Sequence, residues 1–231
     1  MVAAPPLSHR LNLTSAERKD FRWEYADPGP EGGDLVWAQL VLNTMHESGI
    51  GSIFTSQGIL FKGGRTESFR QRLIGRGHLE AVITLPSGFL PGTGLPSTIL
   101  VFNKAQSPHS LNAGVLMVDL STSKTSAKAR QLFNAQYEMP DAIASLVLAH
   151  RKGLKIQTKN FQHFKLQCTT VRSGVLAENQ FNLLPSRYLK TQVDRPDIEN
   201  LKEMIAQVEE NIDELNRQLA NRRRPSNERP K

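Results

Sequence analysis

Long apolar runs, paired cysteines and clustered histidines are all absent from this 231-residue sequence. No stretch approaches the roughly 18 consecutive apolar residues that a membrane helix needs, and residues 1–6 lack the basic and apolar regions of a signal peptide. A single cysteine, Cys168, excludes an internal disulfide. The six histidines are scattered, without the spacing of zinc ligands. We therefore expect a cytoplasmic protein with no membrane contact, no metal site and no disulfide.

Positive charge is concentrated at the C-terminus. Residues 217–231 contain six Lys or Arg and one Glu, a net charge of +5, and the formal net charge of the whole chain is +7. A basic tail of this kind can bind nucleic-acid phosphates without sequence preference. It can equally be the solvated end of a helix, so charge alone decides nothing. The weak candidates for DNA contact are Arg222, Arg223 and Arg224.

Helical and strand patterns alternate after a Pro- and Gly-rich segment at 5–33, which is typical of a long surface loop. Asp34 offers an N-cap to an apolar helix that we expect to run to about Met45 and to be followed by Gly49. Apolar runs predict strands at 50–55, 79–85, 97–102 and 115–119, and helices at 65–74 and 140–152.

This order predicts an α/β sheet, because parallel strands need helical crossovers. The segment between the strands at 79–85 and 97–102 shows no helical pattern, so a wide hairpin is favoured over a crossover. The last of these strands would then be antiparallel. A parallel sheet closed by one antiparallel edge hairpin is typical of class I (Rossmann-like) methyltransferases. A fold alone does not establish a function.

Four segments carry a more specific pattern: Gly51–Phe61 with Gly63, Gly64 and Arg70; Ala81–Phe89; Gly92–Phe102; and Ala177–Leu183 with Pro185–Tyr188. Ordinary tight turns explain each glycine individually. In their order and spacing, however, the segments resemble the C-terminal half of the modification (M) subunit of type I restriction–modification systems, an N6-adenine DNA methyltransferase family. The resemblance implies S-adenosylmethionine as the family's methyl donor and DNA adenine as its substrate.

The resemblance also identifies a candidate catalytic loop, supported by matches at Arg22, Trp23, Asp34 and Trp37. The family loop reads Asn-Pro-Pro-aromatic, and the corresponding residues here are Ala4, Pro5, Pro6 and Leu7. In the family the asparagine and a proline carbonyl accept hydrogen bonds from the adenine amine. The aromatic ring stacks on the flipped-out base, a kind of contact worth about 1–3 kcal/mol.

Ala4 has no side-chain acceptor, and Leu7 offers only apolar contact. We therefore expect the loop to be degenerate and non-functional. The alternative is a Pro-Pro pair in a disordered N-terminus. The family's donor site, a Gly-rich turn and an acidic residue on the first strands, would precede Met1. Within the chain, Gly92-Thr93-Gly94 comes closest to a dinucleotide fingerprint, but it leads into a strand instead of a helix. We expect no S-adenosylmethionine binding by this chain alone.

A heptad pattern marks the C-terminal region. Its apolar residues alternate spacings of three and four: Ile198, Leu201, Ile205, Val208, Ile212, Leu215 and Leu219. The pattern predicts a long coiled-coil-type helix. A helix packed against its own domain fits the pattern equally well. The resemblance favours the partner-binding interpretation, because the family docks this region on the specificity (S) subunit.

Three regions follow: a partial methyltransferase α/β domain at 1–125, a mixed connecting region at 126–192, and the heptad helix with its basic tail at 193–231. The sequence predicts a truncated N6-adenine DNA methyltransferase that is inactive alone. Two alternatives stay open. The chain could be one part of a split enzyme, completed by a polypeptide that carries the missing N-terminal half. It could instead be a non-enzymatic module that binds the S subunit or DNA through its C-terminal helix.

Overall fold

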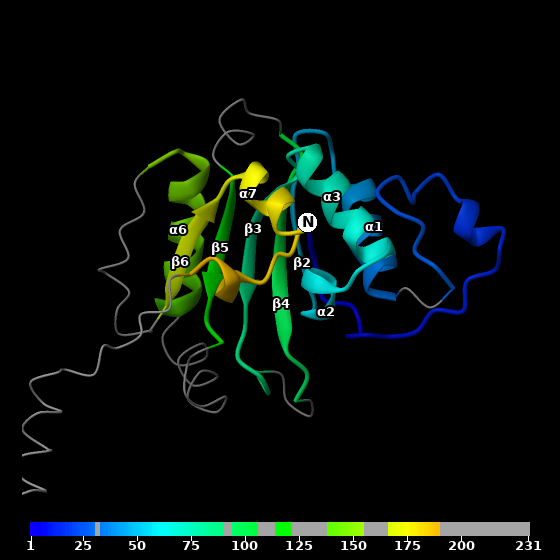
Figure 1. Ribbon diagram of the computed structural model, residues 1–231, viewed down its shortest axis with the longest axis horizontal. Coiled ribbons are helices and arrows are strands. Elements are labelled where there is room, and N and C mark those ends of the chain that lie inside the picture. Colours follow the sequence, from blue (N-terminus) through cyan, green and yellow to red (C-terminus); the bar gives the residue numbers. More distant parts are fainter. Residues whose placement is uncertain (31–32, 90–93, 106–113, 122–137, 155–165, 190–231) are drawn as a thin grey trace, which may run out of the picture. The chain divides into compact units, whose positions relative to one another are not determined.

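The computed structural model describes residues 1–30, 33–89, 94–105, 114–121, 138–154 and 166–189. Residues 1–189 form one unit and residues 190–231 a second. The described residues contain a six-stranded mixed sheet in the order β1-β2-β4-β3-β5-β6 (Figure 1). Its strands are β1 (Val2–Ala3), β2 (Ile50–Ser56), β3 (Leu79–Thr84), β4 (Ser97–Asn103), β5 (Val115–Asp119) and β6 (Gln167–Val171).

Strand directions confirm part of the predicted topology. β1 runs parallel to β2, and β3 runs parallel to β5, whereas β4 is antiparallel to both β2 and β3. The strand predicted at 97–102 is β4, and its predicted antiparallel direction is therefore confirmed. Its predicted edge position is wrong: β4 lies between β2 and β3, and the sheet continues through β5 to an antiparallel β6. The residues of β4 are buried on both faces apart from the half-buried Ile99, as is typical of an interior strand.

Helices cover both faces of the sheet. Neighbouring residues of β3 point to opposite faces, with Val82 in one apolar core and Ala81 and Ile83 in the other. The first core takes residues from α1 (Gly33–Thr44), α2 (Gly58–Phe61), α3 (Arg65–Gly75) and α7 (Ser173–Glu178), and the second takes residues from α6 (Glu138–Arg151). Two short 3₁₀ helices, η1 (Glu17–Lys19) and η3 (Pro185–Arg187), complete the described elements.

The predicted helices at 34–45, 65–74 and 140–152 thus correspond to α1, α3 and α6. Asp34 does not precede its helix as a cap, because α1 begins at Gly33 and places Asp34 in the first turn. The predicted mixed connecting region at 126–192 contributes β6 to the sheet and α7 to its first core. None of the helices in the described ranges is long and apolar enough to cross a membrane. The heptad residues 198–219 and Arg222–Arg224 lie outside the described residues, so the C-terminal helix stays a prediction.

Candidate functional site

The carboxyl ends of β1 and β2 lie at the same edge of the sheet, because the two strands are parallel. Ligands of open α/β sheets bind outside this edge. Ala4–Leu7 directly follows β1, so the predicted loop lies there. The pairing of Val2 and Ala3 with Ser52 and Ile53 contradicts the alternative of a disordered N-terminus. The loop's catalytic role stays a prediction.

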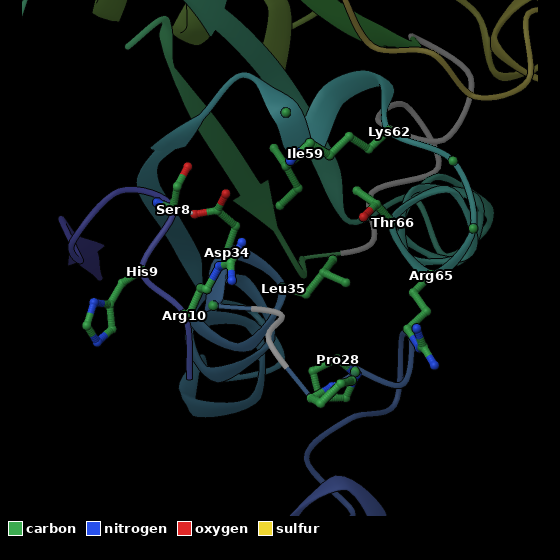
Figure 2. Close-up of a pocket in the computed structure, with 16 residues that line it drawn as sticks. Ser8, His9, Arg10, Pro28, Asp34, Leu35, Ile59, Lys62, Arg65 and Thr66 are labelled. Atoms are coloured by element: carbon green, nitrogen blue, oxygen red, sulfur yellow. Dashed lines mark hydrogen bonds between the residues drawn. The ribbon is translucent and has the colours of Figure 1, made fainter. Parts of the chain in front are cut away.

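A cleft of about 680 Å³ opens next to this loop, within the roughly 300–1,000 Å³ typical of ligand pockets. Segments far apart in the sequence form its walls, with Ser8 and Arg10 on one side and Lys62 and Thr66 on the other (Figure 2). The lining residues come from three segments: Ser8–Arg10 after β1, Pro28–Pro30 with Gly33–Leu35 at the start of α1, and Gly58, Ile59 and Lys62–Thr66 around α2 and the start of α3.

Asp34 joins the loop after β1 to the end of β2. The Ser8 backbone N–H donates to Asp34 Oδ1 at 3.2 Å, and the Ser56 hydroxyl donates to Asp34 Oδ2 at 2.5 Å. Ser8 has a φ of 52°, an uncommon left-handed conformation for a residue with a side chain. Gly33 packs directly on the backbone carbonyl of His9, leaving no room for a Cβ. The start of α1 thus fastens the loop.

One carboxylate, that of Asp27, connects the two segments that meet at the rim of the cleft near residues 27 and 65. Asp27 accepts from Arg18 at 2.8 Å, from the Gly29 N–H at 2.9 Å and from Arg65 at 3.3 Å. The Arg18 guanidinium, with further help from the Gly29 amide and Arg65, holds the pKa of Asp27 well below its usual range. Asp27 therefore stays ionised and connects η1 to the first residue of α3.

The wall at 59–62 is supported from behind by Arg70, a fully buried arginine of α3. Its guanidinium donates to the carbonyls of Phe181 at 2.6 Å, Ile59 at 3.0 Å and Lys62 at 2.8 Å. Burial lowers the pKa of Arg70 to about 10. The guanidinium still carries its charge at neutral pH, and it links the turn at Phe181 to the cleft wall.

The surface loop at 5–30 is attached to the body through Tyr25 and His78. Both side chains are buried, and the Tyr25 hydroxyl lies 2.7 Å from His78 Nδ1. Burial, followed by the nearby positive charges of Lys104 and Arg76, lowers the pKa of His78, against opposing effects of Glu47 and Glu24. The neutral imidazole is therefore the form that this contact favours.

We expect acidification to destabilise the fold through His78. Its pKa in the folded chain lies below the ordinary value of 6.5, so the unfolded chain binds more protons between the two values. The contribution is complete above that ordinary value and is lost as the pH falls toward the folded pKa. Urea unfolding between about pH 7.5 and about pH 5.5 should show this loss, and His78→Gln should reduce it. His46→Gln, which replaces an exposed histidine, is the control. If the free energy of unfolding of His78→Gln depended on pH as steeply as that of the wild type, the assignment of this effect to His78 would be contradicted.

The chemistry available in the cleft is mainly that of hydrogen bonding and positive charge. No group of three potential metal ligands occurs in the part of the chain that the structure describes. Sequence reasoning identified Asp34 only as a cap and as a family position, and it gave Ser8 and Ser56 no role of their own. No local signal marks these two serines, since Asp34 lies 26 residues from Ser8 and 22 from Ser56.

Comparison with known proteins finds DNA methylase subunits. The family model described as N-6 DNA Methylase matches residues 1–197. The methylase subunit of the type I restriction enzyme StySJI from Salmonella typhimurium is 28% identical over 111 residues, which are 46% of this chain and 21% of that protein. The MjaVIII methylase subunit from Methanocaldococcus jannaschii is 24% identical over 206 residues, 86% of this chain and 33% of that protein.

A solved structure shows the same fold. The methyltransferase subunit of a type I restriction–modification system from Streptococcus thermophilus superposes with a TM-score of 0.59 at 20% sequence identity. The match covers 82% of this chain and 37% of that subunit. At that identity the likeness concerns the fold alone. This chain spans about a fifth to a third of the curated relatives' length.

Proposed function

Because the chain belongs to the N-6 DNA methylase family, we propose that it is the acceptor side of a type I N6-adenine DNA methyltransferase and is inactive alone. The observation that carries the proposal is the position of Ala4–Leu7. This loop follows β1 at the carboxyl edge of the sheet and leads directly into the cleft at Ser8. This position, at the edge where ligands of open α/β sheets bind, supports the proposal that the loop faces the DNA base.

Inactivity follows from the side chains in the loop. Ala4 cannot accept a hydrogen bond from an adenine amine, and Leu7 cannot stack as an aromatic ring does. The two prolines keep the loop stiff and have fixed φ angles. The chain's own residues can thus hold a loop beside a cleft, but no side chain of Ala4–Leu7 accepts a hydrogen bond from the amine.

The methyl donor that N6-adenine methyltransferases imply is S-adenosylmethionine, and the described cleft does not fit it. Gly63 and Gly64 connect α2 to α3, and the connection from β2 into the four-residue α2 holds a single glycine, Gly58, and not a Gly-rich turn. Asp34, the acidic residue among those that line the cleft, already binds Ser8 and Ser56 through its two oxygens. We propose that another polypeptide segment provides the donor site. Calorimetric titration of the isolated chain with S-adenosylmethionine should show no tight binding; tight binding would remove this part of the proposal.

Restoring the loop should restore activity. We expect Ala4→Asn/Leu7→Phe, combined with a polypeptide that carries the Gly-rich half of a type I methylase subunit, to form N6-methyladenine in DNA. The wild-type chain in the same mixture should form none, because it lacks the amide acceptor and the stacking ring. Transfer of a labelled methyl group to DNA measures the difference, with each single substitution as a control. Equal methylation by wild type and double variant would show that the loop is not the catalytic element.

We propose the specificity subunit as the partner of the heptad residues. The relatives are named as subunits of type I enzymes, which supports assembly with other chains. Ile205→Asp/Ile212→Asp should abolish capture of the S subunit, because each change puts a charge into an apolar seam. Ala206→Asp/Gln207→Asp, at outward heptad positions, is the matched control. Unchanged capture by the first variant would exclude the seam as the interface and favour a helix packed on its own domain.

The cytoplasmic location expected from the sequence stays a prediction.

A further inference from the structure

The loop after β1 begins from a strand of two residues, Val2–Ala3, that is paired with β2. So short a strand fixes only the start of the loop. The position of Leu7 and of the residues that follow must therefore be set by other contacts. We propose that Asp34 is the positioning residue that holds the Ala4–Ser8 loop at the carboxyl edge of the sheet, a role that rests on the proposed function of this loop.

Two hydrogen bonds from different elements converge on the Asp34 carboxylate. Its Oδ1 accepts the Ser8 backbone N–H at 3.2 Å, directly after Leu7. Its Oδ2 accepts the hydroxyl of Ser56, a buried residue at the end of β2, at 2.5 Å. Since β2 belongs to the rigid sheet, the two hydrogen bonds of the carboxylate fix the loop relative to the sheet. Hydrogen bonds to an ionised acceptor are stronger than those between neutral groups.

The surroundings favour a carboxylate at this place. Asp34 lies in the first turn of α1, where the helix dipole stabilises negative charge. Its side chain is half-buried, which limits competition from water. The carboxylate is thus held by the helix on one side and by two donors on the other.

Backbone packing acts in the same direction. Gly33 lies against the carbonyl of His9, so the loop and the start of α1 touch without intervening side chains. Ser8 takes a φ of 52°, and uncommon conformations of this kind persist only where the surrounding structure imposes them. The bond from the Ser8 N–H to Asp34 acts on this residue directly.

The proposal predicts different results for two substitutions. Asparagine keeps an oxygen that can accept the Ser8 N–H, and its amide can donate to the Ser56 oxygen. Alanine keeps neither bond. A role in positioning therefore requires that Asp34→Asn preserve the loop and that Asp34→Ala release it. A role of the charge alone would affect both variants equally.

Hydrogen exchange of the full chain, followed at the amides of Leu7–Arg10, tests the proposal. We expect Asp34→Ala to speed exchange there by about tenfold, Asp34→Asn to leave it within about twofold, and the amides of β3 to stay protected in both. Asp141→Ala in α6, which removes an exposed carboxylate on the other face of the sheet, is the matched control. Ser56→Ala provides a second variant and should speed exchange through the loss of one bond.

Unchanged exchange at Leu7–Arg10 in Asp34→Ala and in Ser56→Ala would overturn the proposal, as would equal acceleration in Asp34→Ala and Asp34→Asn. In the Ala4→Asn/Leu7→Phe background with the complementing half, Asp34→Ala should lower kcat by about tenfold and leave KM for DNA within about twofold. Asp34→Asn should restore most of this kcat. Exchange does not depend on methylation, so a loop that behaves as expected in a mixture without activity would refute the proposed function and leave the positioning role intact.

Discussion

Arg70→Met is expected to lower the free energy of unfolding by roughly 3 kcal/mol. The substitution removes the donor shared by the carbonyls of Ile59, Lys62 and Phe181, and methionine fills much of the same volume. Leaving a buried carbonyl without a partner costs about 1–3 kcal/mol. The bond to Ile59 is buried and those to Phe181 and Lys62 are partly buried, so the three losses together exceed what relief of the buried charge returns. Urea unfolding followed by circular dichroism measures the loss.

Two variants on the same helix define this result. Arg72→Met changes an exposed arginine that donates to the Glu24 carbonyl at 3.1 Å, and its free energy of unfolding should stay within about 0.5 kcal/mol of wild type. Arg70→Lys should be intermediate, because a compact ammonium cannot reproduce the fork of a guanidinium. A loss below about 1 kcal/mol in Arg70→Met would show that water replaces the guanidinium and that Arg70 does not support the cleft wall.

Gly33→Ala is expected to destabilise the start of α1 by about 3 kcal/mol, the upper end of ordinary overpacking. A Cβ at this position would overlap the backbone carbonyl of His9. The obstacle is backbone and not the end of a flexible side chain, so either the loop after β1 or the helix must move. The same displacement should widen or close the cleft, which thermal unfolding and exchange at Leu7–Arg10 would both report.

Gly75→Ala is the matched control, since Gly75 is the last residue of α3 and a Cβ there meets nothing within 4 Å. Alanine at this position should stabilise the chain by about 0.5–1 kcal/mol, because it restricts the unfolded state. If both variants were equally stable, the close approach between Gly33 and His9 would be absent in solution.

Strands β2 to β5 were predictable because each is a compact apolar run between turn residues, whereas β1 and β6 were not predicted from the sequence. The antiparallel direction of β4 was predictable too, since the segment before it lacks a helical pattern. Its place between β2 and β3 was not. A strand's neighbours depend on pairings with distant segments, and the register from Ile50–Asn103 to Ser56–Ser97 has no counterpart in the local pattern.

The candidate site divides in the same way. Sequence resemblance located Ala4–Leu7 and identified Arg70 as a matching position, but it gave neither the cleft nor the role of Arg70. Ser8, Asp34 and Ser56 look like ordinary loop, cap and strand-end residues in the sequence. They form one junction only because β1 and β2 end at the same edge and α1 starts beside them.

By itself, then, the sequence determined the family and the alternation of helices and strands. These properties are local, since they depend on residue types and on short-range spacing. That Ala4 and Leu7 replace an amide and an aromatic ring of the family's loop stays a prediction. Tertiary structure alone decided the interior position of β4, the cleft, and the contacts of Asp34 and Arg70. The contacts of Asp34, and the contact of Arg70 with Phe181, join residues that are 22 to 111 positions apart in the sequence. The contacts of Arg70 with Ile59 and Lys62 join residues that are closer in the sequence. Long-range contacts arise from burial and strand pairing across the whole sheet, which no local pattern encodes.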